Sequence, residues 1–315
     1  MPRGGPRVGA GRPAGTGPHR EPTMSMRVPL SLVPEVSSLL AANIDQCDHG
    51  SQPRLSSLSA CFDAWTVPSV GQVSIAGPVS ARTALESLDA RGVHAAVVHL
   101  DPWYRDKNAR GRTDVLTEML PLLHLAARVG QHVFVWGWPE AVARLVDHIP
   151  KPLALDTWLT WSYKNAPSRS RGWRPAQQSC LHLRCPSAPL YPEHFYSNDD
   201  RARAAENRLE FKPSPRSVIE SALLVGWVKR QEQTGYRAQK PVDVIETLLR
   251  MTTVPGDLVV DPTCGSGTTG VAAVKLGCSA MLSDRASLAV RTTRKRLAAN
   301  IDEAPNDSTR NEKFV

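Results

Sequence analysis

A glycine-rich stretch near the end of the chain holds the first residues whose types and spacing could do chemistry. The residues VVDPTCGSGTTG (259–270) form an apolar run that turns into a loop of glycines and small hydroxyl side chains. Gly265, Gly267 and Gly270 follow the G-x-G-x-x-G spacing that lets a backbone approach a nucleotide, and Asp284 lies where a ribose-binding acid belongs. No Gly-Lys-Ser/Thr follows, so the loop is not a P-loop. The stretch predicts a nucleotide-like ligand, and a tight turn without a ligand is the alternative.

Two features favour S-adenosylmethionine over NAD at this loop. Asp261 opens the loop, and its carboxylate would repel a pyrophosphate but suits a ligand that carries an ammonium and a sulfonium group. Only 31 residues follow Asp284, so the other half of the sheet must come from earlier in the chain. A dinucleotide enzyme normally continues forward from its fingerprint, which leaves an NAD oxidoreductase as the weaker alternative.

Strand and helix patterns alternate along most of the chain, and these elements must position the loop. We expect strands over residues 71–77, 93–100, 131–138, 153–164, 257–262 and 279–282. We expect helices over residues 81–92, 113–130, 140–149, 241–253 and 267–277, with a final basic helix through Arg296. This alternation predicts an α/β fold with a largely parallel, doubly wound sheet.

Residues 165–237 break the alternation and lie in the part of the chain that carries most of the net positive charge. The formal net charge is +8, and between Lys164 and Lys240 there are 14 Lys and Arg against 7 Asp and Glu. We interpret this segment as an insert in which only residues 179–185 resemble a strand. Its charge is typical of a protein that binds a polyanion such as nucleic acid, and a solvated basic face is the alternative.

The ends of the chain have a different composition. Residues 1–26 are rich in Gly, Pro and Arg and have no apolar core of a signal peptide, which predicts a disordered lead-in. We also expect a disordered tail over residues 301–315 and assign no role to residues 27–70. No apolar run reaches the ~18 residues of a membrane span, so we expect none.

The six cysteines show no paired framework. Without an export signal we expect free thiols and a cytoplasmic protein. Cys180, His182 and Cys185 are candidate metal ligands, but a fourth partner is not evident, and their spacing also suits alternating strand positions. We therefore predict no metal site.

The block AQKPVDVIETLLRMTTVPGDLVVDPTCGSGTTGVAAVKLG (238–277) resembles the cofactor half of the DNA amino-methyltransferases, which methylate adenine N6 or cytosine N4. Because DPWY (101–104) precedes it, the motif order resembles the beta group of that family. The resemblance implies a seven-stranded, Rossmann-like methyltransferase fold with a circularly permuted motif order. Residues 71–164 would form its catalytic half, residues 165–237 its target-recognition insert and residues 238–300 its cofactor half.

The resemblance also implies which residues bind S-adenosylmethionine. The strand, loop and helix around Gly265 would hold its methionine portion, Asp284 its ribose hydroxyls, and the segment from Gln239 to Pro241 would pack beside the site. The implied set is Asp261, Thr263, Gly265, Ser266, Gly267, Thr268, Asp284 and Lys240.

The tetrapeptide DPWY is the candidate catalytic site. The lone pair of an exocyclic amine is delocalised into its base, so catalysis needs acceptors for the amine hydrogens, and Asp101 supplies a carboxylate. By resemblance, the Pro102 carbonyl is the second acceptor, and Tyr104 stacks on a flipped base. Trp103 stands where the family has a second proline, so either aromatic could be the stacking platform. A plain turn after a strand is the structural alternative.

These patterns favour a site-specific DNA methyltransferase acting on adenine N6, because Asp at the position of Asp101 is commoner in the adenine enzymes of the family. No Pro-Cys nucleophile motif occurs, so we expect direct transfer to an amine. The alternatives are a cytosine N4 enzyme, an RNA adenosine N6 methyltransferase and a catalytically degenerate nucleic-acid-binding protein. Double-stranded DNA is the expected partner, and a restriction endonuclease is a candidate one. Candidate phosphate contacts in the insert are Arg169, Arg171, Arg174, Arg201, Arg203 and Arg208.

Overall fold

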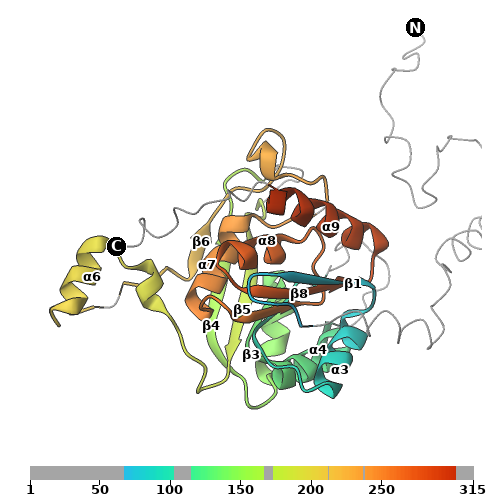
Figure 1. Ribbon diagram of the computed structural model, residues 1–315, viewed down its shortest axis with the longest axis horizontal. Helices are drawn as coiled ribbons and strands as arrows, with labels where there is room; N and C mark the ends of the chain where they lie inside the picture. The colour runs from blue at the N-terminus through green and yellow to red at the C-terminus, as the bar shows by residue number, and fades with distance from the viewer. Residues whose placement is uncertain (1–66, 103–114, 167–172, 212, 237, 303–315) are drawn as a thin grey trace, which may run out of the picture. The chain divides into compact units, whose positions relative to one another are not determined.

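The computed structural model describes residues 67–102, 115–166, 173–211, 213–236 and 238–302 (Figure 1). Internal contacts divide the chain into Met1–Ala60 and Cys61–Val315, and every described residue belongs to the second unit. The predicted lead-in, almost all of residues 27–70 and most of the predicted tail lie outside the described residues. None of the described helices is long and apolar enough to cross a membrane.

The described strands form one sheet of eight. In spatial order they are β1 (Val73–Pro78), β8 (Ser279–Asp284), β7 (Leu258–Asp261), β2 (Ala95–Leu100), β3 (Gly130–Gly137), β5 (Gln177–Arg184), β4 (Ala154–Ser162) and β6 (Val218–Glu220). Neighbouring strands run parallel except at β5, which is antiparallel to both β3 and β4. The predicted α/β fold with a mostly parallel sheet is confirmed, and the short edge strand β6 raises the strand number from the predicted seven to eight.

Helices cover both faces of this sheet (Figure 1). One face carries α3 and α4, and the other carries α7, α8 and α9, as a doubly wound fold requires. The predicted helix at 140–149 is divided into the short α5 and a 3-10 turn. The helix bounds are α3 (Ala81–Ala90), α4 (Val115–Val129), α5 (Pro139–Val142), α6 (Asn198–Ala205), α7 (Val242–Thr252), α8 (Thr268–Lys275) and α9 (Ser287–Asp302). The 3-10 turns are η2 (Ala143–His148), η3 (Pro192–Phe195) and η4 (Arg230–Glu232).

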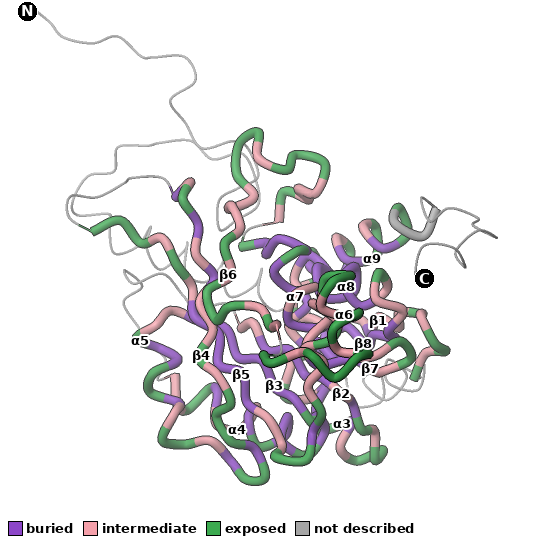
Figure 2. Tube along the Cα trace, turned by 90° about the vertical axis from the view of Figure 1, so that its left-hand side faces the viewer, coloured by how far each residue is buried: buried purple, intermediate pink, exposed green. Residues whose placement is uncertain are grey.

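The central strands are buried on both faces, which explains their unbroken apolar runs. Side chains alternate across a strand, so Val98 and Leu100 of β2 join the core beneath α3 and α4, whereas Val97 joins the core beneath α7 and α8. Figure 2 shows the central strands as buried segments, together with much of α7 and α8, whereas the exposed segments are mainly loops and the outer helices. The two cores hold the carboxyl ends of the strands in fixed positions.

Part of the predicted insert belongs to the sheet. Residues 177–184 form β5, which pairs with β3 on one side and β4 on the other. Leu181 and Leu183 are fully buried, so this strand is a central element of the core. An insert beginning at residue 165 is therefore wrong for β5, because strand pairing depends on partners that lie distant in the sequence.

The chain order is permuted relative to the spatial order. The strands β1 and β2 are consecutive in sequence, but β8 and β7 from the end of the chain lie between them. From β7 the chain passes through α8 to β8, and from β2 it passes through α4 to β3 on the opposite side. Ligands of open α/β sheets bind where the connections diverge in this way, at the carboxyl ends of the strands. The site is therefore expected at the ends of β2 and β7.

Candidate functional site

The two sequence motifs meet at this switch point. The strands β2 and β7 are paired with Val98 opposite Val260, so both motifs leave the sheet side by side. The Asp101 backbone N–H donates to the Thr263 hydroxyl at 2.8 Å. Thr263 in turn donates its hydroxyl and its backbone N–H to Asp261 Oδ1, at 3.0 and 2.9 Å. Asp101 and the glycine loop are thus joined through Thr263.

The glycines of the loop adopt conformations that other residues rarely reach. Gly265 and Gly267 have φ of +53° and +78°, and Gly267 is the N-cap residue of α8. A Cβ atom on Gly267 would lie 2.9 Å from Thr293 Cγ2, and one on Gly265 would lie 3.2 Å from Tyr236 Cε1. The loop is therefore packed against α9 on one side and lies close to the Tyr236 ring on the other.

Asp261 has contacts that differ from its predicted role. Its side chain is 2% exposed, and Oδ2 accepts a hydrogen bond from the Thr269 hydroxyl at 2.6 Å and lies 3.3 Å from His99 Nδ1. Thr263 donates two hydrogen bonds to the other oxygen, Oδ1, so Asp261 holds the loop together through both of its carboxylate oxygens. The carboxylate turns inward beneath the loop, although the sequence pattern predicted that it would face a cationic ligand.

His99 connects Asp261 to the core. The Trp136 indole N–H donates to His99 Nε2 at 2.8 Å, and since an indole nitrogen can only donate, Nε2 must be an acceptor. His99 therefore carries its hydrogen on Nδ1, which faces Asp261. Burial raises the pKa of Asp261, but His99, the Thr269 hydroxyl and the Thr263 backbone N–H outweigh it and hold the pKa below its usual range.

Asp284 lies at the end of β8, beside the loop. Its Oδ2 accepts the Gly265 backbone N–H at 3.0 Å, and its Oδ1 accepts that of Ala286 at 2.8 Å. Burial raises the pKa of Asp284 despite these two donors. The carboxylate remains half-buried at the carboxyl edge of the sheet, where the sequence placed a ribose-binding acid.

Lys240 reaches the predicted catalytic motif. Its ammonium group lies 2.5 Å from Asp101 Oδ2 and 4.6 Å from the centroid of the Trp136 ring. Its backbone carbonyl accepts the Thr268 hydroxyl at 3.0 Å, so the same residue also touches the start of α8. Lys240, which the sequence predicted as a cofactor-binding residue, thus lies beside the loop and directs its charge at Asp101.

The start of α8 is held by a buried arginine. Arg296 of α9 donates to the Thr268 hydroxyl at 2.9 Å and to the Ser266 carbonyl at 3.3 Å. Glu232 lies 3.6 Å from this guanidinium and accepts the Val242 backbone N–H at 2.6 Å, which joins α9 to the start of α7. Burial lowers the pKa of Arg296. Ser266 and Thr268 are buried.

A family comparison agrees with this arrangement. Residues 100–294 match the model of the N6/N4 methyltransferase family, which is described as DNA methylase. The chain belongs to this family of DNA methylases.

Several solved structures share its fold. The M1.HpyAVI–SAM complex superposes with a TM-score of 0.55 at 19% identity, covering 72% of this chain and 99% of that one. The cytosine-N4-specific PvuII DNA methyltransferase superposes with a TM-score of 0.53 at 15% identity, covering 72% of this chain and 88% of that one. The type II methyltransferase M.EcaI of Enterobacter cloacae is 39% identical over 72 residues, which span 23% of this chain and 16% of that relative.

Several residues of the candidate site were not selected from the sequence. They are His99, Tyr236, Thr293 and Arg296, and Trp136 was assigned only to the core or the pocket wall. The His99 imidazole within the apolar run AAVVHL could have been a signal, because a buried polar group needs a partner. Burial, with Asp284 and Cys264 nearby, raises the pKa of Tyr236 to about 12.

The predicted catalytic motif is described in part. Asp101 and Pro102 lie at the end of β2, and Trp103 and Tyr104 fall outside the described residues. Arg169 and Arg171 fall outside them as well. Within the described ranges, no group of three His, Cys, Asp or Glu could hold a metal ion.

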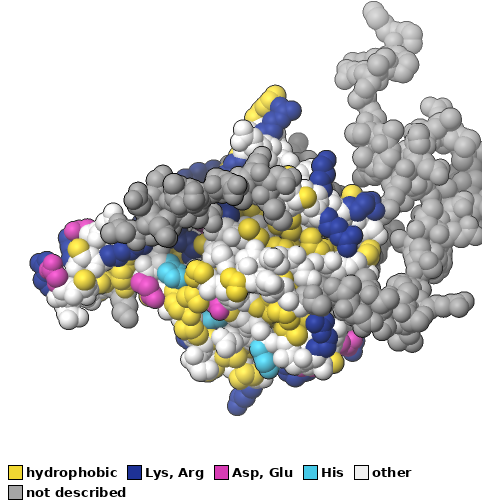
Figure 3. All heavy atoms as spheres, viewed as in Figure 1, with side chains coloured by type: hydrophobic (Ala, Val, Ile, Leu, Met, Phe, Trp, Pro, Cys, Tyr) yellow, Lys and Arg dark blue, Asp and Glu magenta, His cyan; other side chains and the backbone are white. Residues whose placement is uncertain are grey.

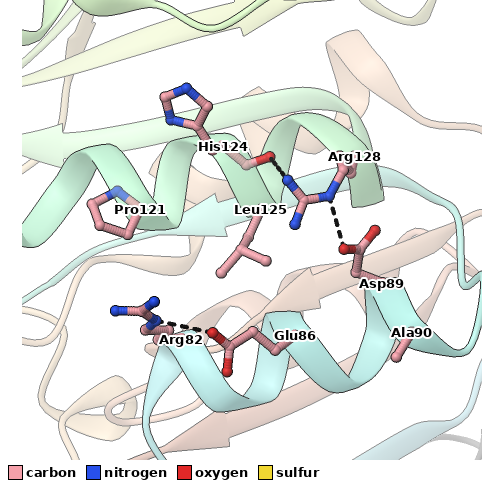
Figure 4. A pocket seen from close by; sticks show the side chains of 8 residues that line it. All are labelled: Arg82, Glu86, Asp89, Ala90, Pro121, His124, Leu125 and Arg128. Carbon is pink, nitrogen blue, oxygen red and sulfur yellow. Dashed lines mark hydrogen bonds and ion pairs between the residues drawn. The ribbon is translucent and has the colours of Figure 1, made fainter.

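A shallow hollow lies on the other face of the methylase, between α3 and α4 (Figure 4). Its charged side chains pair with each other: Arg82 with Glu86 at 2.9 Å, and Arg128 with Asp89 at 2.7 Å. These helices cover the face of the sheet opposite to α7 and α8, so the hollow is distinct from the site at the switch point.

Proposed function

We propose that this chain is an S-adenosylmethionine-dependent DNA methyltransferase of the beta group, which methylates an exocyclic amine and prefers adenine N6. The observation that carries the proposal is the direct link from Asp101 to the glycine loop through Thr263, at the divergence of β2 and β7. This link places a hydrogen-bond acceptor next to the segment predicted to hold the methyl donor.

The residues at the loop fit S-adenosylmethionine. Gly265 has a φ of +53° and carries no Cβ, and a Cβ added there would lie 3.2 Å from Tyr236 Cε1, so glycine keeps the space between the loop backbone and this ring. Asp284 presents a half-buried carboxylate beside Gly265, suited to ribose hydroxyls. When bound, the donor supplies a methyl group on a sulfonium centre. We therefore assign Gly265 and Asp284 to direct contact, and Asp261, Thr263 and Ser266 to support of the loop.

The proposed reaction needs an acceptor more than a strong base. In this reaction the amine nitrogen would form a bond to the methyl carbon, the carbon–sulfur bond would break with its electron pair going to sulfur, and one amine hydrogen would leave as a proton to solvent. Asp101 accepts a hydrogen bond from the amine, which makes the nitrogen lone pair more available for attack. By the family resemblance, the Pro102 carbonyl accepts the second hydrogen, and Trp103 or Tyr104 stacks on the base.

The segment between β5 and α7 supports a nucleic-acid partner. The loop joining β6 and α7 projects from the sheet in Figures 1 and 2, and its Trp227 is 83% exposed with the Arg230 guanidinium 4.5 Å over the ring. Figure 3 shows further basic side chains over α9, where Arg291, Arg294 and Lys295 are exposed. Exposed aromatic and basic groups suit stacking on bases and contact with phosphates. We propose double-stranded DNA as the substrate.

Mapping of modified bases tests the proposal. The full chain is expressed in a host without DNA methylation, and the modified bases are mapped by single-molecule sequencing, with Asp101→Ala as the matched control. We expect N6-methyladenine at one sequence motif with wild type and none with the variant. Detection of N4-methylcytosine would show that the target base is cytosine, and methylation of RNA alone would show that the substrate is RNA. A host without new modification, combined with no binding of labelled S-adenosylmethionine, would refute the proposal. A clustered gene for a nuclease that cuts the same motif would identify a restriction partner.

A further inference from the structure

We infer that Lys240 is a positioning residue that orients the Asp101 carboxylate toward the target amine and does not bind the methyl donor. The inference rests on the proposed function, and it concerns a contact between residues 139 positions apart in the sequence.

The described contacts of the Lys240 ammonium group are with Asp101 and with the Trp136 ring beside it. It lies 2.5 Å from Asp101 Oδ2 and 4.6 Å from the Trp136 ring centroid, and the Lys240 side chain is only 5% exposed. The face of an aromatic ring attracts a cation, so Trp136 supports the ammonium on a side where water is excluded. The lysine is therefore held between one carboxylate and one ring.

A lysine in this position requires a functional explanation. Removing an ammonium group from water costs several kcal/mol, and a buried ion pair is often no more stable than an apolar replacement of the same shape. The pair is also asymmetric, because the Asp101 side chain remains 28% exposed. Burial of the Lys240 ammonium group therefore costs free energy, and its partner is the Asp101 carboxylate, which stays partly exposed to solvent.

The arrangement selects which Asp101 oxygen can work. Lys240 occupies Oδ2, and within the described part of the chain Oδ1 accepts no hydrogen bond. The Asp101 backbone N–H is fixed to Thr263, so the side chain has little freedom left once Oδ2 is held. Lys240 therefore directs Oδ1 to the approaching amine, in the geometry that the direct transfer needs.

The backbone of Lys240 makes this orientation depend on the loop. Its carbonyl accepts the Thr268 hydroxyl, and Thr268 also accepts a hydrogen bond from Arg296. The residue thus joins the start of α8, where the methyl donor is proposed to bind, to the carboxylate that receives the target amine. One residue sets the relative position of donor and acceptor.

A double-mutant cycle tests the inference on the full chain. The variants are Lys240→Met, Asp101→Asn and the double variant, with Lys275→Met as the control because Lys275 is an exposed basic residue at the end of α8. We expect Lys240→Met to lower kcat roughly 100-fold, the usual effect of misplacing a reacting group, while the Kd for S-adenosylmethionine stays within about 2-fold. In the Asp101→Asn background the same change should cost little more, because its partner is gone.

The outcomes separate the possible roles of Lys240. A weaker Kd for S-adenosylmethionine with an unchanged kcat would overturn the inference in favour of donor binding, as would equal losses in both backgrounds. If Asp101→Asn is too slow to measure, the Kd and kcat of Lys240→Met decide. If Lys240→Met does not fold, Lys240→Arg keeps the charge but moves Oδ2, so kcat must fall while Kd is retained. Methylation by wild type establishes the proposed function independently of these results.

Discussion

Replacement of Gly267 by alanine isolates the steric constraint at the centre of the loop. At φ of +78° an alanine is strained by about 1–2 kcal/mol. Its Cβ would also lie 2.9 Å from Thr293 Cγ2, 3.0 Å from its Oγ1 and 3.2 Å from its Cα, so α9 must shift, at about 1–3 kcal/mol. Gly267→Ala should therefore destabilise the protein by about 2–5 kcal/mol, which lowers Tm by roughly 5–15 °C.

Gly92→Ala is the matched control. Gly92 has φ of +62°, but a Cβ there would meet no atom within 4 Å, so the variant carries the backbone strain alone. Both variants also lose the same entropy in the unfolded chain. Urea unfolding should show Gly267→Ala as the less stable of the two. Thr293→Ser removes Cγ2 and keeps the hydroxyl that donates to the Gly265 carbonyl, so it should recover about 1 kcal/mol in the Gly267→Ala background. Equal stability of Gly267→Ala and Gly92→Ala would refute the packing described for this loop.

Three further predictions concern the loop support, the response to acid and the DNA surface. Asp261→Asn should lower the free energy of unfolding, measured in urea, by about 3 kcal/mol, because it removes a buried charge with four described contacts. If the variant instead lost binding of S-adenosylmethionine and kept its stability, Asp261 would be a cofactor-binding residue, as the sequence predicted. Burial lowers the pKa of His132 to about 3 and that of His182 to about 4; His132 Nδ1 lies 3.0 Å from His182 Nε2, and His182 faces Asp156, which is paired with Arg184. As pH falls below about 6.5, the two histidines of the unfolded chain become protonated while those of the folded chain stay neutral, so the folded state loses stability. The urea concentration at the unfolding midpoint should therefore fall between pH 6.5 and 4. In a His132→Asn/His182→Asn variant this midpoint should depend less steeply on pH. Trp227→Ala should weaken duplex binding by about 5-fold to 100-fold in an anisotropy titration, without a change in Tm. The control Leu288→Ala, on α9, should leave the affinity unchanged. If the Trp227→Ala variant bound DNA as tightly as wild type, Trp227 would not contact the DNA.

Much of the fold follows from local patterns. The apolar run before Asp261, the glycines after it and the amphipathic segment from Val242 predict β7, the loop and α7 within one or two residues. These predictions succeed because strand burial, positive φ and helix periodicity are properties of neighbouring residues. The permuted order was also predictable, since the motif DPWY precedes the glycine loop in the sequence.

The contacts within the site could be predicted only in part. The pattern identified Asp101, the loop and Lys240 as members of one site, and the structure brings them together. It did not indicate that Asp261 turns inward to His99, because that contact joins two neighbouring strands of the sheet, β2 and β7, that lie far apart in the sequence. The place of β5 was missed for the same reason, since a short run in a basic segment gives no sign of its two partners.

The amino-acid sequence by itself determined the chemical groups of this methylase, the order of its motifs and the conformations that its glycines allow. These follow from residue type and from interactions over a few positions. Only the tertiary structure decided which oxygen of Asp101 is held, which carboxylate supports the loop and which one lies open beside it. Those choices depend on distances between residues such as Asp101 and Lys240, and a chain sets such distances only when its sheet is assembled.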